Sequence, residues 1–565
     1  MTETTRVCGM LGAGDPARVR RMAGAAGLTP QESGTAVIVD RPAALLIGST
    51  ALRARPEDCG EAWMFSTATP EPAGLGTAPV RWEHAARDAD VAGVVLEPDG
   101  ATVLHTGISG VQPVYVEQHE DVVYFATQLN LLVDTAPGPL APDWTGWAQI
   151  IGIGAPLAGR TTVEGIRRLG PMEQVRLERG GAPRRSRVTW PWEQITPEPG
   201  LTPESLTSEV LEAMRGQVAA LGESGPLQPM LSGGRDSRLL TGLADELGQP
   251  GGLTAWTTSS DTGTTLEELT AARIASGLGI RQRIVPGRHD GFAQDFADYA
   301  EVTGHQASFH VWLMPVAREL ARQQGTVLDG LGGGVFLGGG FPDDPAVLQE
   351  GGGSQELMTS RFGRLARYLQ VAEELLAPGV AGALTAAGRD DFMTIAEPLA
   401  EHPQGATLTA YLTRTLPGIS MAPAAVLGGS RPTAVPIMSH QVVSQALRVE
   451  PAAKRDGRWY PDLLRRVRPE FDDIPTAADL TTGRQHVRRG ASLDAAAWYR
   501  ELVMASPAAA LLGEKLRDGD AELWRRQLTR TRAQHLIRGL ALLALWLRRH
   551  ENRLTETDPT PLRRG

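Results

Sequence analysis

Segments typical of strands and of helices alternate in the middle of the chain. Residues 227–231, 253–258 and 281–285 are strand-like, and residues 238–247 and 266–276, which lie between them, are helical in pattern. This order of elements predicts a parallel sheet with helices on both faces, because parallel neighbours need a crossover connection. Ligands of such sheets bind at the carboxyl ends of the strands.

A turn that contains glycines lies between the first of these strands and its helix. Two glycines permit a tight turn whose backbone N–H groups point one way, and the helix N-terminus adds partial positive charge. A carboxylate there repels phosphate directly, so we expect it to hold Mg²⁺ against the phosphate oxygens. An ordinary strand-to-helix turn is the alternative interpretation. The residues of this turn are Leu231, Ser232, Gly233, Gly234, Arg235, Asp236 and Ser237.

The turn differs from a Walker A loop, since it has no GxxxxGK[ST] pattern. It matches the SGGxDS pyrophosphate loop of enzymes that cleave ATP between the α and β phosphates. Its surroundings resemble the asparagine synthetase superfamily over most of the chain. In the first half, residues 8–12 (CGMLG), 107–116, 122–134 and 160–171 are similar to the glutaminase domain of that family.

The resemblance implies two domains. Residues 1–190 are expected to form a glutaminase-like αββα sandwich of the N-terminal-nucleophile type, which fits the closely spaced strand-like runs found there. Residues 191–203 contain four prolines and are expected to be a linker. Residues 204–565 are expected to form a synthetase domain of the adenine nucleotide α-hydrolase (PP-loop) type.

The first domain is expected to be inactive as a glutaminase. In that chemistry the nucleophilic cysteine is residue 1, because its free α-amine activates the thiol. Seven residues precede Cys8, so we interpret Cys8 as a packing residue. Within the superfamily, this feature points to β-lactam synthetases and lasso peptide cyclases.

Residues 303–313, 326–339, 431–451 and 457–470 resemble lasso peptide cyclases more closely. The resemblance implies ATP-dependent adenylation of an Asp or Glu side chain of a precursor peptide. The N-terminal amine of the peptide then closes a macrolactam. A leader-binding protein and a leader protease are implied as partners. The alternatives are a small-molecule ligase of the β-lactam synthetase type and a non-catalytic peptide-binding relative.

Two positions depart from the family pattern. Gly334 stands where the family has a second aspartate ligand for Mg²⁺, so either Asp329 or the pair Asp343 and Asp344 substitutes, or the metal relies on Asp236, phosphates and water. Leu331 stands where relatives carry an acid or a tyrosine that assists deprotonation of the nucleophile. A peptide α-amine tolerates this loss, since its pKa of about 7.7–8.0 leaves roughly a third of it neutral at pH 7.5.

Further candidate residues lie elsewhere in the chain. His305 and His310 are candidate proton acceptors, with histidines satisfied in the core as the alternative. Arg484 and Arg488 stand where the family has a lysine against the developing phosphate charge, and a solvated basic turn is the alternative. The adenosine pocket is expected to include Trp256, Thr257, Thr258, Asp329 and Gly330, although core packing explains the tryptophan equally well.

Composition limits the remaining possibilities. The formal net charge of -10 argues against binding nucleic acid through phosphate neutralisation. Two cysteines in 565 residues exclude a disulfide scaffold and a cysteine-based zinc module. The first ten residues lack a signal-peptide pattern, and the apolar run 539–547 is too short to span a bilayer. We therefore expect a cytoplasmic protein that does not associate with membranes.

Overall fold

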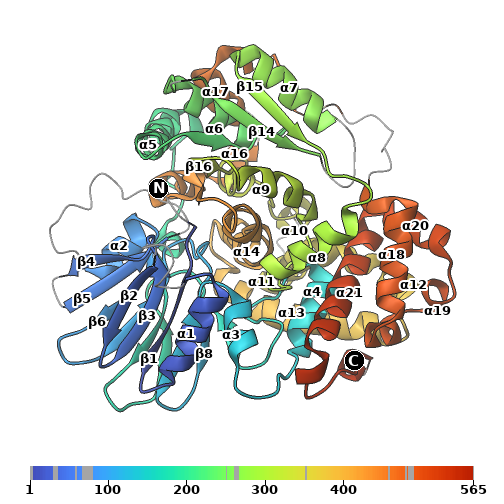
Figure 1. Ribbon diagram of the computed structural model, residues 1–565. Coiled ribbons are helices and arrows are strands. Elements are labelled where there is room, and N and C mark those ends of the chain that lie inside the picture. The colour runs from blue at the N-terminus through green and yellow to red at the C-terminus, as the bar shows by residue number, and fades with distance from the viewer. Residues whose placement is uncertain are drawn as a thin grey trace.

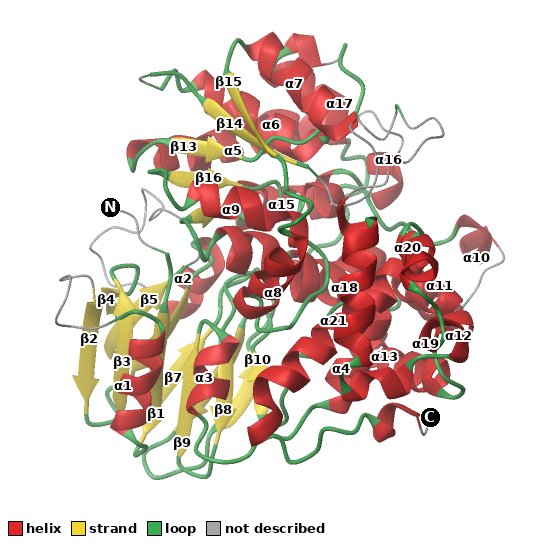
Figure 2. Cartoon of the chain, turned by 45° about the vertical axis from the view of Figure 1, so that its right-hand side comes forward, coloured by secondary structure: helices red, strands yellow, loops and turns green. Residues whose placement is uncertain are grey.

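The structure is a computed structural model, and its strands gather in two separate regions (Figure 1, Figure 2). Antiparallel sheets occupy the N-terminal part, a parallel sheet lies in the middle of the chain, and helices make up most of the rest. The described residues are 4–28, 36–57, 60–66, 81–249, 251–259, 266–349, 353–455, 459–471, 473–476, 480 and 489–563.

Two antiparallel sheets lie face to face in the N-terminal part (Figure 2). The first sheet runs in the order β10 (Ile166–Arg168), β8 (Tyr115–Gln118), β9 (Val122–Ala126), β1 (Val7–Gly12), β3 (Ala44–Ser49) and β2 (Ala36–Arg41). The second runs in the order β12 (Arg184–Arg187), β11 (Glu173–Leu177), β7 (Thr102–His105), β6 (Ala92–Leu96), β5 (Gly60–Phe65) and β4 (Arg53–Glu57). The β-rich region predicted for this part is confirmed.

Alternation of side chains along β1 explains the layers. Val7 and Leu11 point into the core between the two sheets, whereas Cys8 and Met10 point to the opposite face. Helices α1 (Pro16–Ala25) and α3 (Leu129–Thr135) cover that opposite face, and α2 (Trp82–Asp88) covers the second sheet. Burial raises the pKa of the Cys8 thiol to about 12, so Cys8 behaves as a small apolar residue.

The parallel sheet combines strands that are close in sequence with strands that are distant. Strands β13, β16 and β17 pair in that order, β14 pairs with β15, and the bridge between Met230 and Trp256 joins the two sets. The sheet order is therefore β15-β14-β13-β16-β17. The strands are β13 (Leu227–Pro229), β14 (Thr254–Thr258), β15 (Arg281–Val285), β16 (Thr326–Leu328) and β17 (Thr433–Ala434).

Pro229 explains why β13 and β14 pair over so short a length. Proline has no N–H to donate to a neighbouring strand. Pairing with β14 begins one residue later, at Met230, and the Leu231 N–H donates to the Trp256 carbonyl at 2.7 Å. The indole N–H of Trp256 donates to Gln228 Oε1 at 2.7 Å, which adds a side-chain link between the two strands.

The crossover helices of the predicted α/β unit are present with shifted bounds. Helix α6 begins three residues before the predicted start and α7 ends two residues after the predicted end. Gly234 is extended and caps α6, which brings Asp236 and Ser237 into the first helical turn. The helices of this unit are α5 (Pro203–Glu223), α6 (Arg235–Glu246), α7 (Leu266–Leu278), α8 (Phe292–Val302) and α9 (Met314–Leu320).

Helices dominate the chain beyond the parallel sheet (Figure 1). They are α10 (Pro345–Gln349), α11 (Ser354–Leu365), α12 (Ala372–Leu375), α13 (Val380–Ala396), α14 (Gly405–Ala410), α15 (His440–Leu447), α16 (Pro451–Arg455), α17 (Trp459–Val467), α18 (Leu493–Met504), α19 (Glu514–Arg517), α20 (Ala521–Leu528) and α21 (Thr531–His550). None of the helices in the described ranges is long and apolar enough to cross a bilayer.

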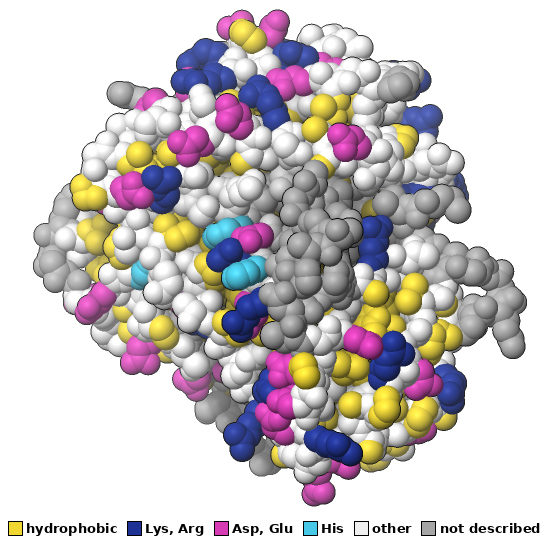
Figure 3. All heavy atoms as spheres, turned by 90° about the vertical axis from the view of Figure 1, so that its left-hand side faces the viewer, with side chains coloured by type: hydrophobic (Ala, Val, Ile, Leu, Met, Phe, Trp, Pro, Cys, Tyr) yellow, Lys and Arg dark blue, Asp and Glu magenta, His cyan; other side chains and the backbone are white. Residues whose placement is uncertain are grey.

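The two regions share a continuous core. Helix α21 packs against α4 (Trp144–Ile153), which lies between β9 and β10 of the first antiparallel sheet in sequence. In the predicted linker, Trp192 is fully buried and its ring contacts Phe336 and Tyr411. The domain boundaries therefore stay a prediction. On the face seen in Figure 3, positive and negative side chains are interspersed.

The contact between α21 and α4 gives a test of this packing. A Cβ on Gly539 of α21 would lie 2.6 Å from the Cα of Ile151, so Gly539→Ala should destabilise the protein by about 1–3 kcal/mol. The control is Gly216→Ala on the exposed side of α5, where a Cβ meets nothing within 4 Å. That substitution should stabilise by about 0.5–1 kcal/mol. Thermal unfolding of both variants is the measurement, and equal melting temperatures would contradict the packing.

Candidate active site

The loop that follows β13 lies at the point where the strand order of the parallel sheet reverses. Strand β13 has β14 on one side and β16 on the other. The sheet continues to β15 beyond β14 and to β17 beyond β16, so it extends in both directions from β13. In open α/β sheets, ligands bind at this reversal, beyond the carboxyl ends of the strands. Residues 231–237, the motif identified in the sequence, form this loop and the first turn of α6.

Hydrogen bonds within the loop hold its backbone in a compact turn. The Ser232 N–H donates to Ser237 Oγ at 3.0 Å, and the two serine hydroxyls are 2.9 Å apart. The Gly234 N–H donates to Ser232 Oγ at 3.1 Å. The two serines therefore fix the loop from its two ends, which keeps the first turn of α6 beside the end of β13.

One backbone N–H of the loop binds an anionic oxygen. The Gly233 N–H donates to Glu267 Oε2 at 2.7 Å, and Glu267 lies in the first turn of α7. An N–H that accommodates a carboxylate oxygen also suits a phosphate oxygen, since both are charged acceptors of similar size. This contact supports the interpretation of the loop as an anion-binding turn, and the sequence alone did not suggest Glu267.

Asp236 is the central carboxylate of the site. Its Oδ1 accepts from the Tyr460 hydroxyl at 2.5 Å, and its Oδ2 accepts from the Gly334 N–H at 3.2 Å. Burial raises the pKa of Asp236, and these two hydrogen bonds oppose the rise. The carboxylate thus links α6, the glycine-rich segment 330–340 and α17.

Glycines of that segment allow its backbone to approach Asp236 closely. A Cβ on Gly330 would lie 2.7 Å from the Asp236 Cβ, and a Cβ on Gly333 would lie 2.3 Å from the Asp236 Cγ. At Gly334, by contrast, a Cβ would meet nothing within 4 Å. Gly334 therefore contributes its N–H to the site, and the space around its Cα is open.

Asp329 is a second buried carboxylate close to Asp236. It follows β16, and its Oδ1 accepts from the Leu331 N–H at 2.9 Å. Burial, together with the negative charge of Asp236, raises the pKa of Asp329 to about 6. Neither Asp236 nor Asp329 forms an ion pair with a residue that the structure describes, and two such neighbouring carboxylates suit a divalent cation with oxygen ligands. Within the described ranges, no group of three or more His, Cys, Asp or Glu side chains is arranged to hold a metal.

The alternative ligands Asp343 and Asp344 are engaged elsewhere. Asp343 forms a bidentate ion pair with the buried Arg361, at 2.7 and 2.8 Å. Asp344 Oδ1 accepts from the Ala346 N–H at 3.0 Å, which caps the start of α10. These contacts leave Asp329 as the better placed second carboxylate.

The residues proposed for the adenosine pocket lie at the ends of neighbouring strands. Thr257 Oγ1 donates to the Leu231 carbonyl at 2.8 Å, and Thr258 Oγ1 donates to the Trp312 carbonyl at 2.7 Å. Trp256 is buried within the sheet, where Arg283 stacks on its ring at 5.3 Å. Trp256 therefore packs in the core, and the two threonines stand at the edge beside the loop.

The two candidate histidines lie apart from the loop. His305 is buried near Arg549 and His550, and burial lowers its pKa to about 3. His310 lies two residues before Trp312, with its ring 5.0 Å from the indole, and burial lowers its pKa to about 4. Both rings are therefore neutral at pH 7, and the structure does not bring either against Asp236.

Arg484 and Arg488 lie outside the described residues. The chain before them is held beside the loop, because Arg238 of α6 donates to the carbonyls of Phe471, Ile474 and Pro475. The chain after them is fixed by Arg489, which is buried and forms an ion pair with Asp295 of α8. Arg238 was not identified from the sequence, since its role depends on carbonyls more than 230 residues away.

Tyr460 was also missed from the sequence. The segment around it has a strong helical amphipathic pattern, which indicates a buried face of α17 and nothing about chemistry. Leu331, which the sequence resemblance predicts to stand in place of an acid or a tyrosine, is buried in the core with Phe336 and Met438. The side chain that contacts Asp236 is instead Tyr460, which lies in α17 and far from Leu331 in sequence.

Comparison with known sequences agrees with this geometry. The family described as asparagine synthase matches residues 209–536, more than half of the chain. The match includes the loop, the glycine-rich segment and Tyr460. No curated protein matches the chain significantly.

The raised pKa of Asp329 gives a stability test that is independent of activity. The folded state holds the Asp329 proton more tightly than the unfolded state, so the free energy of unfolding decreases as pH rises from about 4 to about 6. Asp329→Asn should remove this decrease and stabilise the protein at pH 8, by about 3 kcal/mol at most. Melting temperatures of both proteins from pH 4 to pH 8 are the measurement. Parallel pH profiles would contradict the burial of an ionised Asp329.

Proposed function

Because the chain belongs to the asparagine synthase family, we propose that it is an ATP- and Mg²⁺-dependent lasso peptide cyclase. Proteins of this family carry an ATP-dependent amide-forming domain and generally use Mg²⁺. The observation that supports an ATP-consuming reaction most directly is the placement of the loop 231–237, Asp236 and Asp329 together at the reversal of the parallel sheet.

The residues of the site fit the nucleotide and the metal. The backbone N–H groups of the loop and the Ser232 and Ser237 hydroxyls would hold the phosphates that leave as pyrophosphate. Asp236 and Asp329 would hold Mg²⁺, since their buried carboxylates form no ion pair with a described residue. The metal supplies charge neutralisation for the phosphate oxygens.

The proposed reaction has two steps. A side-chain carboxylate of the precursor peptide attacks the α-phosphorus of ATP, and the bond to the pyrophosphate breaks. The N-terminal amine of the peptide then attacks the acyl carbon, AMP leaves, and the amine loses a proton. Tyr460 orients Asp236 through its hydroxyl and thereby fixes one carboxylate of the metal site.

The buried Leu331 supports the proposal that the nucleophile is a peptide amine. The side chain that assists deprotonation in relatives is absent at that position, and an N-terminal amine is partly neutral near pH 7.5 without such a base. The resemblance of residues 303–313 and 326–339 to lasso peptide cyclases supports the same substrate. A leader-binding protein and a leader protease belong to the proposal, because the resemblance implies both.

Exchange of labelled pyrophosphate into ATP tests the proposed chemistry. Asp236→Ala should reduce exchange by at least about 10²–10³-fold, because the metal loses a central ligand. The matched control is Asp245→Ala on the same helix, where the carboxylate pairs with Arg468 at 2.7 Å. Exchange by the control should stay near that of the wild type. A wild-type protein that exchanges nothing at any peptide concentration would instead indicate a non-catalytic relative.

Substrate class requires a separate measurement. Intact-mass analysis with peptides that carry Asp or Glu at ring-closing distance should detect the loss of one water on cyclisation. Small β-amino acids serve as the comparison, because a ligase of the β-lactam synthetase type would use them instead. Product from the small molecules and none from peptides would contradict the peptide assignment.

The two adjacent glycines of the glycine-rich segment give a matched pair of variants. Gly333→Ala places a methyl group against the Asp236 carboxyl. It should reduce pyrophosphate exchange by about 10²-fold, since a displacement of the carboxylate by about 1 Å is enough for a loss of this size. Gly334→Ala enters open space and should leave exchange close to the wild-type rate. Gly334→Asp should lower the Mg²⁺ concentration needed for half-maximal exchange. Equal effects of the two alanine variants would contradict the geometry around Asp236.

A further inference from the structure

Arg538 on α21 is buried without a counter-ion. Arg538 is 2% exposed, and its Nε and Nη2 atoms have no hydrogen-bond partner. Among the residues that the structure describes, no carboxylate forms an ion pair with it. Arg489, which is 4% exposed, pairs with Asp295 instead. A buried guanidinium without a partner is costly, so a ligand is the natural explanation.

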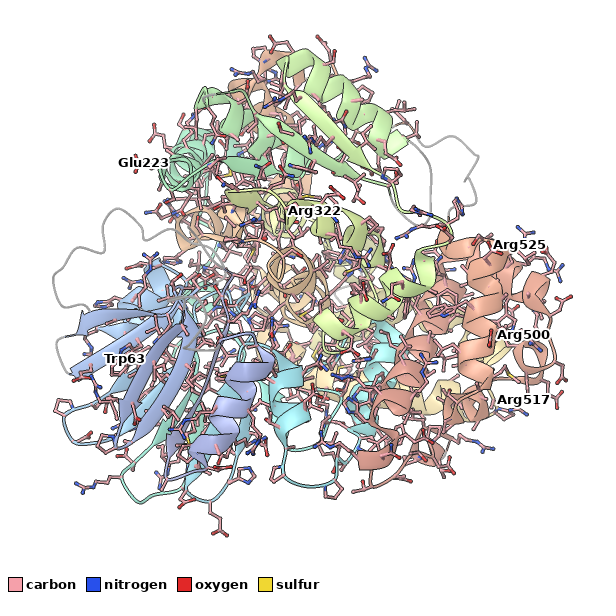
Figure 4. The ribbon with its side chains drawn as sticks, viewed as in Figure 1. Trp63, Glu223, Arg322, Arg500, Arg517 and Arg525 are labelled. Carbon is pink, nitrogen blue, oxygen red and sulfur yellow. The ribbon has the colours of Figure 1, made fainter. Side chains whose placement is uncertain are left out.

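Other arginines of the same region have partners. Figure 4 labels Arg500, Arg517 and Arg525 on the outer side of the helical region. Arg525 pairs with Glu522 at 2.6 Å, and the other two donate to backbone carbonyls at 2.8 Å. The missing partner of Arg538 is therefore a local feature and not a general property of the arginines of this region.

Four more basic side chains lie in the same part of the structure as Arg538. We call these residues the Arg538 cluster. Arg538 and Arg414 both lie close enough to His310 to contribute to its lowered pKa. The same two arginines and Arg367 act in this way on His535. The members of the cluster are His310, Arg367, Arg414, His535 and Arg538.

Aromatic side chains form the walls of the cluster. Tyr368 stacks on His535 with the ring centroids 3.8 Å apart, and the ring of Phe309 meets His535 edge-on at 5.4 Å. The Arg367 guanidinium donates to the Tyr368 hydroxyl at 2.9 Å. These contacts fix the rings without supplying negative charge, so the cluster is a rigid basic site with an apolar lining.

The exposure of the members decreases inward from the surface. Arg367 is exposed, Arg414 and His310 are partly exposed, and His535 and Arg538 are buried. In the binding mode inferred below, an anionic group would approach from the side of Arg414 and His310 and would meet Arg538 at the inner end. Its charge would be balanced by the arginines of the cluster, and most closely by the buried Arg538.

Two chains of contacts connect the cluster with the candidate active site. His310 lies against Trp312, whose carbonyl accepts from Thr258 at the end of β14. The Arg414 guanidinium lies 4.9 Å from the ring centroid of Phe341. Phe341 follows Gly340, whose N–H donates to the carbonyl of Gly334, the residue that contacts Asp236.

We propose that the Arg538 cluster binds a carboxylate of the substrate other than the carboxylate that is activated. This inference rests on the proposed function for the identity of the substrate as a peptide. The Nε and Nη2 N–H groups share one edge of the guanidinium plane, which matches the two oxygens of a carboxylate. The cluster thereby anchors the substrate beside the glycine-rich segment while another carboxylate reacts at the loop.

Melting temperatures of the full-length protein with glutarate, a dicarboxylate probe, test the cluster. Without any ligand, Arg538→Met should melt at or above the wild-type temperature, because it removes an unpaired buried charge. The matched control Arg489→Met should melt lower, since it removes the buried partner of Asp295 and leaves that buried carboxylate with the half-exposed Arg318 alone. Saturating glutarate should raise the melting temperature of the wild type and of Arg489→Met by about 2–4 °C, and that of Arg538→Met not at all.

Three results would overturn the proposal. Arg538→Met that melts as low as Arg489→Met would show a purely structural arginine. Glutarate that shifts Arg538→Met as much as the wild type would place carboxylate binding elsewhere. Inorganic pyrophosphate serves as the second probe, and it should shift Arg538→Met and the wild type equally. Loss of the pyrophosphate effect in Arg538→Met would assign the cluster to phosphate instead of carboxylate.

Failure of the proposed function is distinguishable from failure of the cluster. Pyrophosphate exchange into ATP reports on the loop, and the glutarate shift reports on Arg538. Absent exchange with an intact glutarate shift would overturn the enzymatic assignment and keep the carboxylate site. Normal exchange with no glutarate shift would overturn the carboxylate site and keep the enzyme.

Discussion

Close contact between Asp236 and the glycine-rich segment is the constraint on which the site depends. The Asp236 carboxylate accepts hydrogen bonds from Tyr460 and from the Gly334 N–H, so it connects three elements that are distant in sequence. This approach requires glycine at 330 and 333, where a Cβ would collide with Asp236. Any side chain at these positions separates the segment from α6 and displaces the carboxylate.

The electrostatics of the site follow from that contact. Burial raises the pKa of both Asp236 and Asp329, and the negative charge of Asp236 raises the pKa of Asp329 further. Such a pair is unfavourable alone and is relieved by a divalent cation. The loop N–H groups face the same region and favour anions, as the contact between Gly233 and Glu267 illustrates. A metal ion with bound phosphates would suit both parts of the site, because the cation faces the two carboxylates and the phosphates face the loop N–H groups.

The sequence predicted the parts of the site that residues close together in the chain form by themselves. The strand–loop–helix unit around Asp236 follows from the glycines and from the alternating pattern, and the βαβαβ order was confirmed. The start of α6 was placed three residues too late, because the extended Gly234 cap was not recognised. Glu267 and Tyr460 were not found, since their roles arise from folding contacts between distant segments. Strands β16 and β17 were not predicted for the same reason, since they join the sheet beside β13 from positions far along the chain.

The most direct test is a crystal structure of the protein with Mg²⁺ and α,β-methylene-ATP, an analogue that resists cleavage between the α and β phosphates. The account predicts that the β and γ phosphates lie on the loop 231–237 and that the metal contacts Asp236. An analogue bound elsewhere, or a metal that contacts neither Asp236 nor Asp329, would contradict it.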